Sequence, residues 1–256
     1  MKQFFEYQLT DDISLISNYL EKSNGEESTE NVCGPMVVGC LNPHSFVIAL
    51  DDPLFHQALK NCDFLLPDGE GICMAMRRRF GTHIDKIAGD DIHRHLISGL
   101  EKKQGKVYYM GSSEKVLTLI KNRLEKEYPS VTVRTLSPSF CDELSEEESM
   151  QIIDDINGFA PDILFVSMTA PKQEKWVEKY RSLLTNVKIV ASIGAVFDFY
   201  AGTVKRAPKW AVKMHVEWLF RLIKEPRRMW QRNFVSTPRF LRYVRRTDFQ
   251  IDSFSD

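Results

Sequence analysis

A carboxylate stands directly after a short apolar run, at the point where a strand would stop. Residues 64–67 read Phe-Leu-Leu-Pro, and Asp-Gly-Glu-Gly follows them. This pattern predicts a buried strand that Pro67 and Gly69 end, because proline lacks an N–H and glycine tolerates a positive φ. Asp68 would then lie at the edge where open α/β sheets bind ligands, and it could act there as a base. The alternative for Asp68 is a turn or cap before a helix that begins near residue 72.

Polar residues and glycines also follow the other expected strands. They are Cys40 and Asn42 after the first strand, Gly111 to Ser113 after the third, residues 168–174 after the fifth, and Gly194 to Asp198 after the sixth. In a parallel sheet these positions share one edge, where a ligand crevice is expected. Gly111 opens a helix whose N–H groups suit a phosphate, although such starts are also ordinary helix caps. In the stretch 171–174, Pro171 and Glu174 are ordinary helix-start residues, whereas the Gln173 amide could hydrogen-bond a sugar or phosphate.

The elements that must position these residues alternate between strands and helices. Expected strands lie near Val37, Leu65, Tyr108, Val133, Phe165 and Val190. Helical patterns of 10–15 residues separate most of them, as parallel βαβ units require. The predicted fold is therefore α/β, with a Rossmann-like parallel sheet of about six strands flanked by helices over residues 33–204. Residues 1–32 are predicted to be a polar, poorly packed lead-in with one helix near residues 12–22.

The net charge of −1 conceals a basic C-terminal end. Residues 205–256 carry 13 Lys and Arg against 5 Asp and Glu, whereas residues 1–204 carry 21 against 30. Residues 207–224 and 227–246 are predicted to be helical and are rich in aromatics, so residues 205–256 are interpreted as a basic helical appendage for an anionic membrane surface. Arg221, Arg228 and Arg232 would share one α-helical face. Arg206 is a candidate phosphate ligand, with a solvated basic turn as the alternative.

Several classes of protein fit the sequence poorly. Five scattered cysteines without a C-x-x-C pair argue against zinc and against a disulfide framework. The chain has no signal-peptide pattern and no run of 18 apolar residues, which predicts a cytoplasmic location without a membrane span. A full G-x-G-x-x-G is missing, which counts against an NAD-dependent oxidoreductase, the alternative function. The acidic body and the lack of a nucleic-acid-binding module argue against nucleic acid as a partner.

With these motifs in place, the chain resembles the WecG/TagA/CpsF glycosyltransferase family from about residue 37 to residue 240. The order and spacing of eight stretches carry the resemblance, namely residues 42–45 (Asn-Pro-His-Ser), 67–69 (Pro-Asp-Gly), 89–91 (Gly-Asp-Asp), 171–174 (Pro-Lys-Gln-Glu), 194–198 (Gly-Ala-Val-Phe-Asp), 201–202 (Ala-Gly), 206–208 (Arg-Ala-Pro) and 217–226 (Glu-Trp-Leu-Phe-Arg-Leu to Glu-Pro). The resemblance implies an inverting transfer of N-acetylmannosamine or a related hexose from a UDP-sugar to a polyprenyl-diphosphate-linked saccharide. It implies neither a cofactor nor a metal, because the family lacks the DxD motif.

The resemblance also implies roles for single residues. Asp68 matches the proposed general base, and Asn42 and Gln173 match residues near the donor and acceptor. Without a metal, cations must stabilise the departing UDP, and the candidates are Lys86, Arg206, Arg221, Arg228 and Arg232. The predicted catalytic set is Asp68, Asn42, Gln173 and Lys86, and the predicted donor-binding set is Cys40, Gly69, Gly111, Gln173, Gly194, Asp198 and Arg206. Arg221, Arg228 and Arg232 are assigned to the acceptor diphosphate or the membrane.

The implied setting is the inner face of the plasma membrane, where the appendage would complete the site. The implied products are cell-surface polymers such as wall teichoic acid, enterobacterial common antigen, capsule or exopolysaccharide, and a homo-oligomer is left open. Three positions depart from the family pattern: Cys40 stands where Thr is common, and Lys86 and Gln231 stand where Arg is expected. A thiol is a weaker hydrogen-bond partner than a hydroxyl, and lysine loses the bidentate geometry of arginine.

Overall fold

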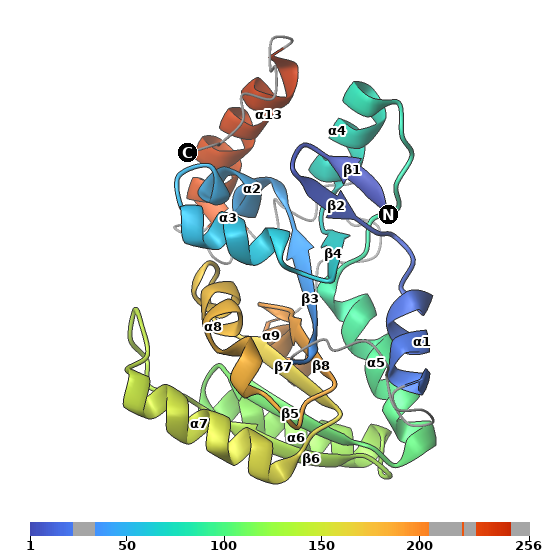
Figure 1. Cartoon of the computed structure of the whole chain (residues 1–256), viewed down its shortest axis with the longest axis vertical. Coiled ribbons are helices and arrows are strands. Elements are labelled where there is room, and N and C mark those ends of the chain that lie inside the picture. The colour runs from blue at the N-terminus through green and yellow to red at the C-terminus, as the bar shows by residue number, and fades with distance from the viewer. Residues whose placement is uncertain (23–33, 205–221, 223–228, 247–256) are drawn as a thin grey trace.

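The computed structural model describes residues 1–22, 34–204, 222 and 229–246, and its centre is an eight-stranded sheet (Figure 1). The strands are β1 (Lys2–Phe4), β2 (Tyr7–Leu9), β3 (Met36–Leu41), β4 (Phe64–Pro67), β5 (Lys106–Gly111), β6 (Thr132–Leu136), β7 (Ile163–Ser167) and β8 (Ile189–Ser192). Their spatial order is β1-β2-β4-β3-β8-β7-β5-β6. The β1–β2 pair is antiparallel and the other pairs are parallel. The predicted α/β, Rossmann-like class is confirmed, with two strands more than expected.

Helices connect the strands much as the sequence pattern predicts. They are α1 (Ser14–Lys22), α2 (Pro43–Ala49), α3 (Pro53–Lys60), α4 (Glu70–Phe80), α5 (Gly89–Lys103), α6 (Glu114–Glu127), α7 (Glu146–Phe159), α8 (Lys172–Tyr180), a 3-10 turn η1 (Arg181–Leu183), α9 (Val196–Ala201), a π-helical turn η2 (Gln231–Ser236) and α13 (Thr237–Arg245). Asn42 and Asp52 cap α2 and α3, and a proline follows each cap in the first helical turn. Both starts follow from the capping preference of Asn and Asp and from the fixed φ of proline.

Apolar side chains cover both faces of the sheet, which is why its strands are continuous apolar runs. In β5, Val107 and Tyr109 pack with residues of α5, α6 and α9 on one face. Tyr108 and Met110 pack with residues of α7 and α8 on the other face. The side-chain alternation of a strand thus places successive β5 residues in two separate cores.

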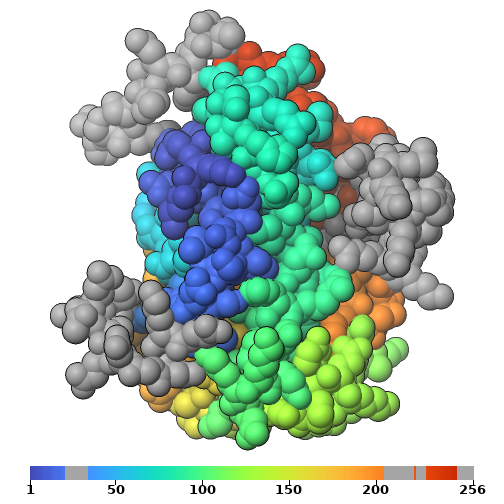
Figure 2. Space-filling view, turned by 90° about the vertical axis from the view of Figure 1, so that its right-hand side faces the viewer, coloured from blue at the N-terminus to red at the C-terminus, as the bar shows by residue number. Residues whose placement is uncertain are grey.

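The prediction of a poorly packed lead-in is wrong for residues 1–22. Phe4 and Leu9 are fully buried, and Leu9 pairs with Leu65 of β4 in parallel register. Ile16 and Leu20 of α1 are buried in the same core as α5, and Figure 2 shows the N-terminal residues (blue) lying against the green residues of the α5 region. Strands of three residues are too short for a clear period-two signal, so sequence patterning missed β1 and β2.

A third core joins the N-terminal hairpin to the C-terminal helix α13. The ring of Phe240 lies 5.4 Å from that of Phe46 in α2, and the Tyr243 ring lies 5.2 Å from that of Phe46. Arg239 forms a two-fold ion pair with Asp51, in which Nη2 lies 2.7 Å from Oδ1. The interpretation of the tail aromatics as membrane-facing is therefore wrong for Phe240, which is buried in this core.

Other parts of the tail differ from the expected continuous α-helix over residues 227–246. Residues 231–236 form a π-helical turn instead, immediately before Pro238. A proline lacks the N–H that an α-helix would need at this position, so the backbone widens locally. Trp230 and Phe234 remain largely exposed. No helix in the described part of the chain is long and apolar enough to cross a bilayer.

Gly111 is predicted to be essential for the sheet, and Gly158 is its matched control. Gly111 has a φ of 120°, and a Cβ there would lie 2.1 Å from the Ser167 carbonyl oxygen. Gly111→Ala should lower the free energy of unfolding by roughly 2–5 kcal/mol, because backbone strain and overpacking add. Gly158 lies in α7 with open space around its Cβ position, so Gly158→Ala should be neutral or stabilising by up to about 1 kcal/mol. Urea unfolding of both variants tests this, and equal effects would contradict it.

Candidate active site

The carboxyl ends of β3 and β4 bring Asp68 and Asn42 to neighbouring positions. Leu41 pairs with Pro67 in the last register position, and the Asp68 N–H donates to the Leu41 carbonyl at 2.8 Å. The helices that follow these strands, α2 and α4, also lie close together. A Cβ on Gly71 of α4 would lie 2.6 Å from Cγ of Pro43 in α2. The glycine thus permits the N-terminus of α4 to pack against that of α2. The predicted juxtaposition of the two site residues follows from this parallel pairing.

Asn42 has a structural role that limits what it can offer a ligand. Its Oδ1 accepts hydrogen bonds from the backbone N–H groups of His44 and Ser45, both at 3.0 Å. The Ser45 hydroxyl accepts in return from the Asn42 N–H at 2.8 Å, which completes a capping box. Because Oδ1 is committed to the helix, a ligand would meet the amide NH2 group of Asn42.

Lys86 lies on the loop over residues 81–88, next to the strand that carries Asp68. The Ile87 N–H donates to the Pro67 carbonyl at 2.9 Å, and the Ile87 side chain is buried while Lys86 is exposed. Burial raises the pKa of the Cys73 thiol in α4 to about 11, and the positive charge of Lys86 opposes that rise. The ammonium group of Lys86 is therefore within electrostatic range of α4, at the same edge as Asp68.

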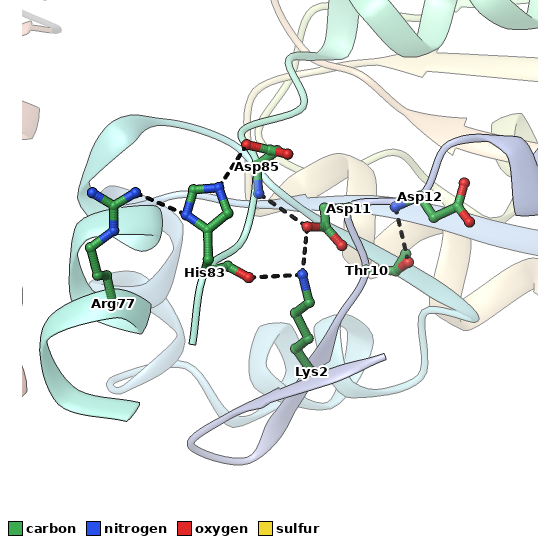
Figure 3. Close-up of polar contacts among 7 residues, drawn as sticks. All are labelled: Lys2, Thr10, Asp11, Asp12, Arg77, His83 and Asp85. Carbon is green, nitrogen blue, oxygen red and sulfur yellow. Dashed lines mark hydrogen bonds and ion pairs between the residues drawn. The ribbon is translucent and has the colours of Figure 1, made fainter. Parts of the chain in front are cut away.

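A clamp from the N-terminal residues holds this loop in place, as Figure 3 shows. Lys2 Nζ donates to Asp11 Oδ2 at 2.6 Å and to the His83 carbonyl at 2.8 Å. Asp11 Oδ2 also accepts from the Asp85 backbone N–H at 3.1 Å. Sequence reasoning missed this clamp because Lys2 and Asp11 lie more than 70 residues before the loop residues that they contact.

Gln173 and Gly194 lie together where β7 and β8 end. Gln173 is buried, its Oε1 accepts from the Met168 N–H at 3.1 Å, and its Nε2 donates to Glu174 Oε1 at 2.8 Å. Gly194 has a φ of 55°, and its Cβ position lies 4.0 Å from Gln173 Nε2. The Ser167 hydroxyl donates to the Gly194 carbonyl and joins the two strand ends. The Gln173 amide thus lies directly beside the turn at Gly194.

The end of β5 offers less to a phosphate than the sequence suggested. The N–H of Ser112 already donates to the Ser167 carbonyl at 3.2 Å. The N–H of Val116 in the first turn of α6 donates to the Ser113 hydroxyl at 3.5 Å. A glycine is required at position 111 because of the positive φ and the close approach to β7. These structural reasons explain the glycine without any contact to a donor.

The remaining predicted donor residues take three different local roles. Gly69 has a φ of 94° and begins α4. Burial, with the nearby carboxylates of Asp68 and Glu174, raises the pKa of the Cys40 thiol well above its ordinary value, so the group is neutral. Asp198 accepts a hydrogen bond from the Thr203 hydroxyl at 3.3 Å and closes the turn after α9. The Cys40 thiol is therefore within electrostatic range of both carboxyl groups.

The basic cluster is described only in part. Arg232 lies half-buried in the π-helical turn η2, whose residue Ser236 contacts His44 through a 2.8 Å hydrogen bond to Nδ1. Arg206, Arg221 and Arg228 lie outside the described residues, so their contribution stays a prediction. The single helical face predicted for Arg221, Arg228 and Arg232 therefore also stays a prediction.

The fold is α/β, and the candidate ligand site lies at the carboxyl ends of its parallel strands, where the candidate residues are a carboxylate, two amides and a cation. Within the described residues, no cluster of three His, Cys, Asp or Glu side chains is placed to hold a metal ion. The chain belongs to the glycosyl transferase WecG/TagA/CpsF family, whose sequence profile matches residues 18–252, and it is a glycosyltransferase.

Two relatives are similar to the chain over most of its length. An N-acetylglucosaminyldiphosphoundecaprenol N-acetyl-β-D-mannosaminyltransferase of Bacillus spizizenii is 28% identical over 242 residues, which cover 94% of this chain and 87% of the relative. A protein with the same activity in its name from Bacillus subtilis is 29% identical over 204 residues, covering 80% of this chain and 77% of the relative.

The clamp on the loop that carries Lys86 generates a prediction. In Asp11→Ala, the Asp85 N–H loses its acceptor and Lys2 loses its ion pair, so residues 81–88 should open more readily by about 1–3 kcal/mol. Hydrogen–deuterium exchange of a peptide that covers residues 81–88 measures this directly. Asp154→Ala, on the exposed face of α7, is the control and should leave that peptide unchanged. Equal exchange in wild type and Asp11→Ala would show that the clamp does not hold the loop.

Proposed function

We propose that this glycosyltransferase moves N-acetylmannosamine or a related hexose from a UDP-sugar to a saccharide linked to a polyprenyl diphosphate, with inversion at the anomeric carbon. The names of both Bacillus relatives support the transferred sugar and the acceptor class, since they specify N-acetylmannosamine and N-acetylglucosaminyldiphosphoundecaprenol. The observation that carries the proposal is the placement of Asp68 beside Asn42 at the ligand-binding edge of the sheet.

Asp68 is the base in the proposed mechanism. An inverting transfer is one in-line displacement, in which the acceptor hydroxyl oxygen attacks the anomeric carbon while the bond to the β-phosphate oxygen of UDP breaks. The hydroxyl proton passes to the Asp68 carboxylate, and UDP leaves with the electron pair of the broken bond. A carboxylate at the site edge can perform this transfer if the hydroxyl comes within hydrogen-bond reach. The Asn42 amide hydrogens and the Gln173 amide then orient the two sugars.

Cations stabilise the negative charge that develops on the departing diphosphate. Lys86 precedes Ile87, whose N–H donates to the Pro67 carbonyl, and Arg232 lies in η2, whose Ser236 hydrogen-bonds His44 at the start of α2. Arg206, Arg221 and Arg228 are proposed to join them. In the proposed mechanism these positively charged side chains supply the stabilisation that a metal gives in other transferases, so the mechanism uses neither a metal nor a cofactor.

The acceptor places the enzyme at a membrane surface in this proposal. A polyprenyl anchor keeps the acceptor diphosphate at the bilayer interface. The C-terminal end of the chain is basic and rich in aromatic residues, which suits such an interface. Trp230, Phe234 and Leu241 are exposed beside the basic residues of α13, and such a surface favours binding to anionic lipids. We propose peripheral association at the inner face of the plasma membrane, in the synthesis of a cell-surface polysaccharide or teichoic acid.

Removing the proposed base should abolish most of the transfer while keeping the fold. In Asp68→Asn, the side chain keeps its size but cannot accept the proton, so the transfer rate should fall by about 10²-fold or more. Release of UDP from a UDP-sugar with a lipid-linked acceptor measures the rate. Asp154→Asn is the exposed control, and Asp68→Asn should keep its melting temperature and its affinity for UDP. Turnover near the wild-type rate in Asp68→Asn would remove Asp68 from the mechanism.

The donor class can be tested by ligand-induced stabilisation. UDP, UDP-N-acetylmannosamine, UDP-glucose, GDP-mannose and NAD are compared in thermal unfolding, each with and without Mg²⁺. A UDP-sugar at 100 times its Kd should add about 2.7 kcal/mol of stability without the metal. A stabilisation that appears only with Mg²⁺ would contradict metal independence. Stabilisation by NAD alone would contradict the transferase proposal and support an oxidoreductase.

A further inference from the structure

Glu174 is a buried carboxyl group beneath the site edge. Its side chain lies in the first turn of α8, and the residue is 7% exposed. Oε1 accepts one hydrogen bond, from Gln173 Nε2 at 2.8 Å, and Oε2 has no hydrogen-bond partner among the residues that the structure describes. Burial raises the pKa of this carboxyl to about 7. An acid at an ordinary helix start would lie in solvent, so the helix-start interpretation does not explain why Glu174 is buried.

The surroundings of Glu174 give it no ligand of its own. It lines a cavity of about 10 Å³ with Val37, Ala58, Cys62, Val177, Glu178 and Ser192. A cavity of that size holds one water molecule at most, so no substrate enters it. The hydrogen bond to Gln173 is therefore the connection between Glu174 and the candidate active site.

That hydrogen bond fixes the orientation of the Gln173 amide. The Met168 N–H donates to Oε1 at 3.1 Å, and Nε2 donates to Glu174. A flipped amide would set its NH2 group against the Met168 N–H, which is repulsive in every state, and its oxygen against Glu174, which is repulsive when that carboxyl is ionised. Nε2 has two hydrogens, and the one not used by Glu174 is left for the side of the turn at Gly194.

We propose that Glu174 is a positioning residue for the transfer site, whose Oε1 holds the Gln173 amide with one N–H directed to the edge where the sugars bind. The inference rests on the proposed function and deepens it. The property required of residue 174 is a hydrogen-bond acceptor at the position of Oε1. A glutamine supplies that acceptor, whereas a leucine of similar size does not.

The activity test compares Glu174→Gln with Glu174→Leu. Glu174→Leu should lower kcat by about 10²-fold, the scale of a reacting group displaced by about 1 Å. Glu174→Gln should stay within about 2-fold of wild type at pH 7, because its amide oxygen replaces Oε1. Glu178→Leu is the matched control, since Glu178 lines the same cavity one helical turn further on. Its kcat should not change.

A double-mutant cycle separates positioning from a general loss of structure. If Glu174 acts through Gln173, Glu174→Leu should lower kcat in wild type but have no further effect in Gln173→Ala. Additive losses, or a Glu174→Gln enzyme as impaired as Glu174→Leu, would overturn the proposal. A wild-type enzyme that transfers no sugar would instead contradict the proposed function.

A second readout needs no turnover. The side-chain amide signals of Gln173, identified by their loss in Gln173→Ala, are followed by ¹⁵N NMR from pH 5 to 9. They should shift with a midpoint near pH 7 in wild type and stay constant in Glu174→Gln. The other titratable groups that face Glu174 are Cys40 in β3, Cys62 before β4 and Glu178 in α8. Burial raises the pKa of both thiols, and Glu178→Gln serves as the control for the third group. Gln173 amide signals that are the same in wild type and in Glu174→Leu at every pH would overturn the proposal.

Discussion

The parallel pairing of β3 with β4 is the constraint on which the candidate site depends. Each strand ends one residue before a functional side chain, and the backbone hydrogen bond from Asp68 to Leu41 sets the two ends level. A slip of one residue would turn Asp68 to the opposite face of the sheet. Pro43 and Gly71 maintain the same closeness in the helices that follow, because only a glycine fits against the proline ring.

The N-terminal hairpin of β1 and β2 lies beside β4 and supports the candidate site from the edge of the sheet. The N-terminal hairpin adds β1 and β2 to the sheet next to β4, and its polar residues Lys2 and Asp11 reach the loop that carries Lys86. A flexible cation would lose conformational entropy each time it met a diphosphate. In the proposed mechanism, Lys2 and Asp11 lower that cost for Lys86 because they hold the loop backbone in advance.

The C-terminal helix α13 links a body with an acidic net charge to a basic end. Its apolar side docks on α2 through Phe240, and Arg239 forms an ion pair with Asp51. The same helix α2 begins at Asn42. Packing of α13 therefore helps to hold α2, the helix that Asn42 caps. It also places η2, which contains Arg232, beside the start of α2. Some aromatic residues of η2 and α13 are buried and others are exposed, according to the helix face on which they lie. Amino-acid composition does not show this difference.

The sequence by itself determined the α/β class, the six strands β3 to β8 and the shared edge of Asp68, Asn42, Gln173 and Gly194. Local rules are sufficient for these, because apolar runs, prolines, glycines and caps act within a few residues. Tertiary structure alone decided the pairing of β2 with β4, the clamp on the Lys86 loop, the docking of Phe240 and the burial of Glu174. Each of these depends on contacts between residues far apart in the chain. Glu174 has the local pattern of an exposed helix start, and only the packing of α8 against β3, β8 and α3 removes it from water.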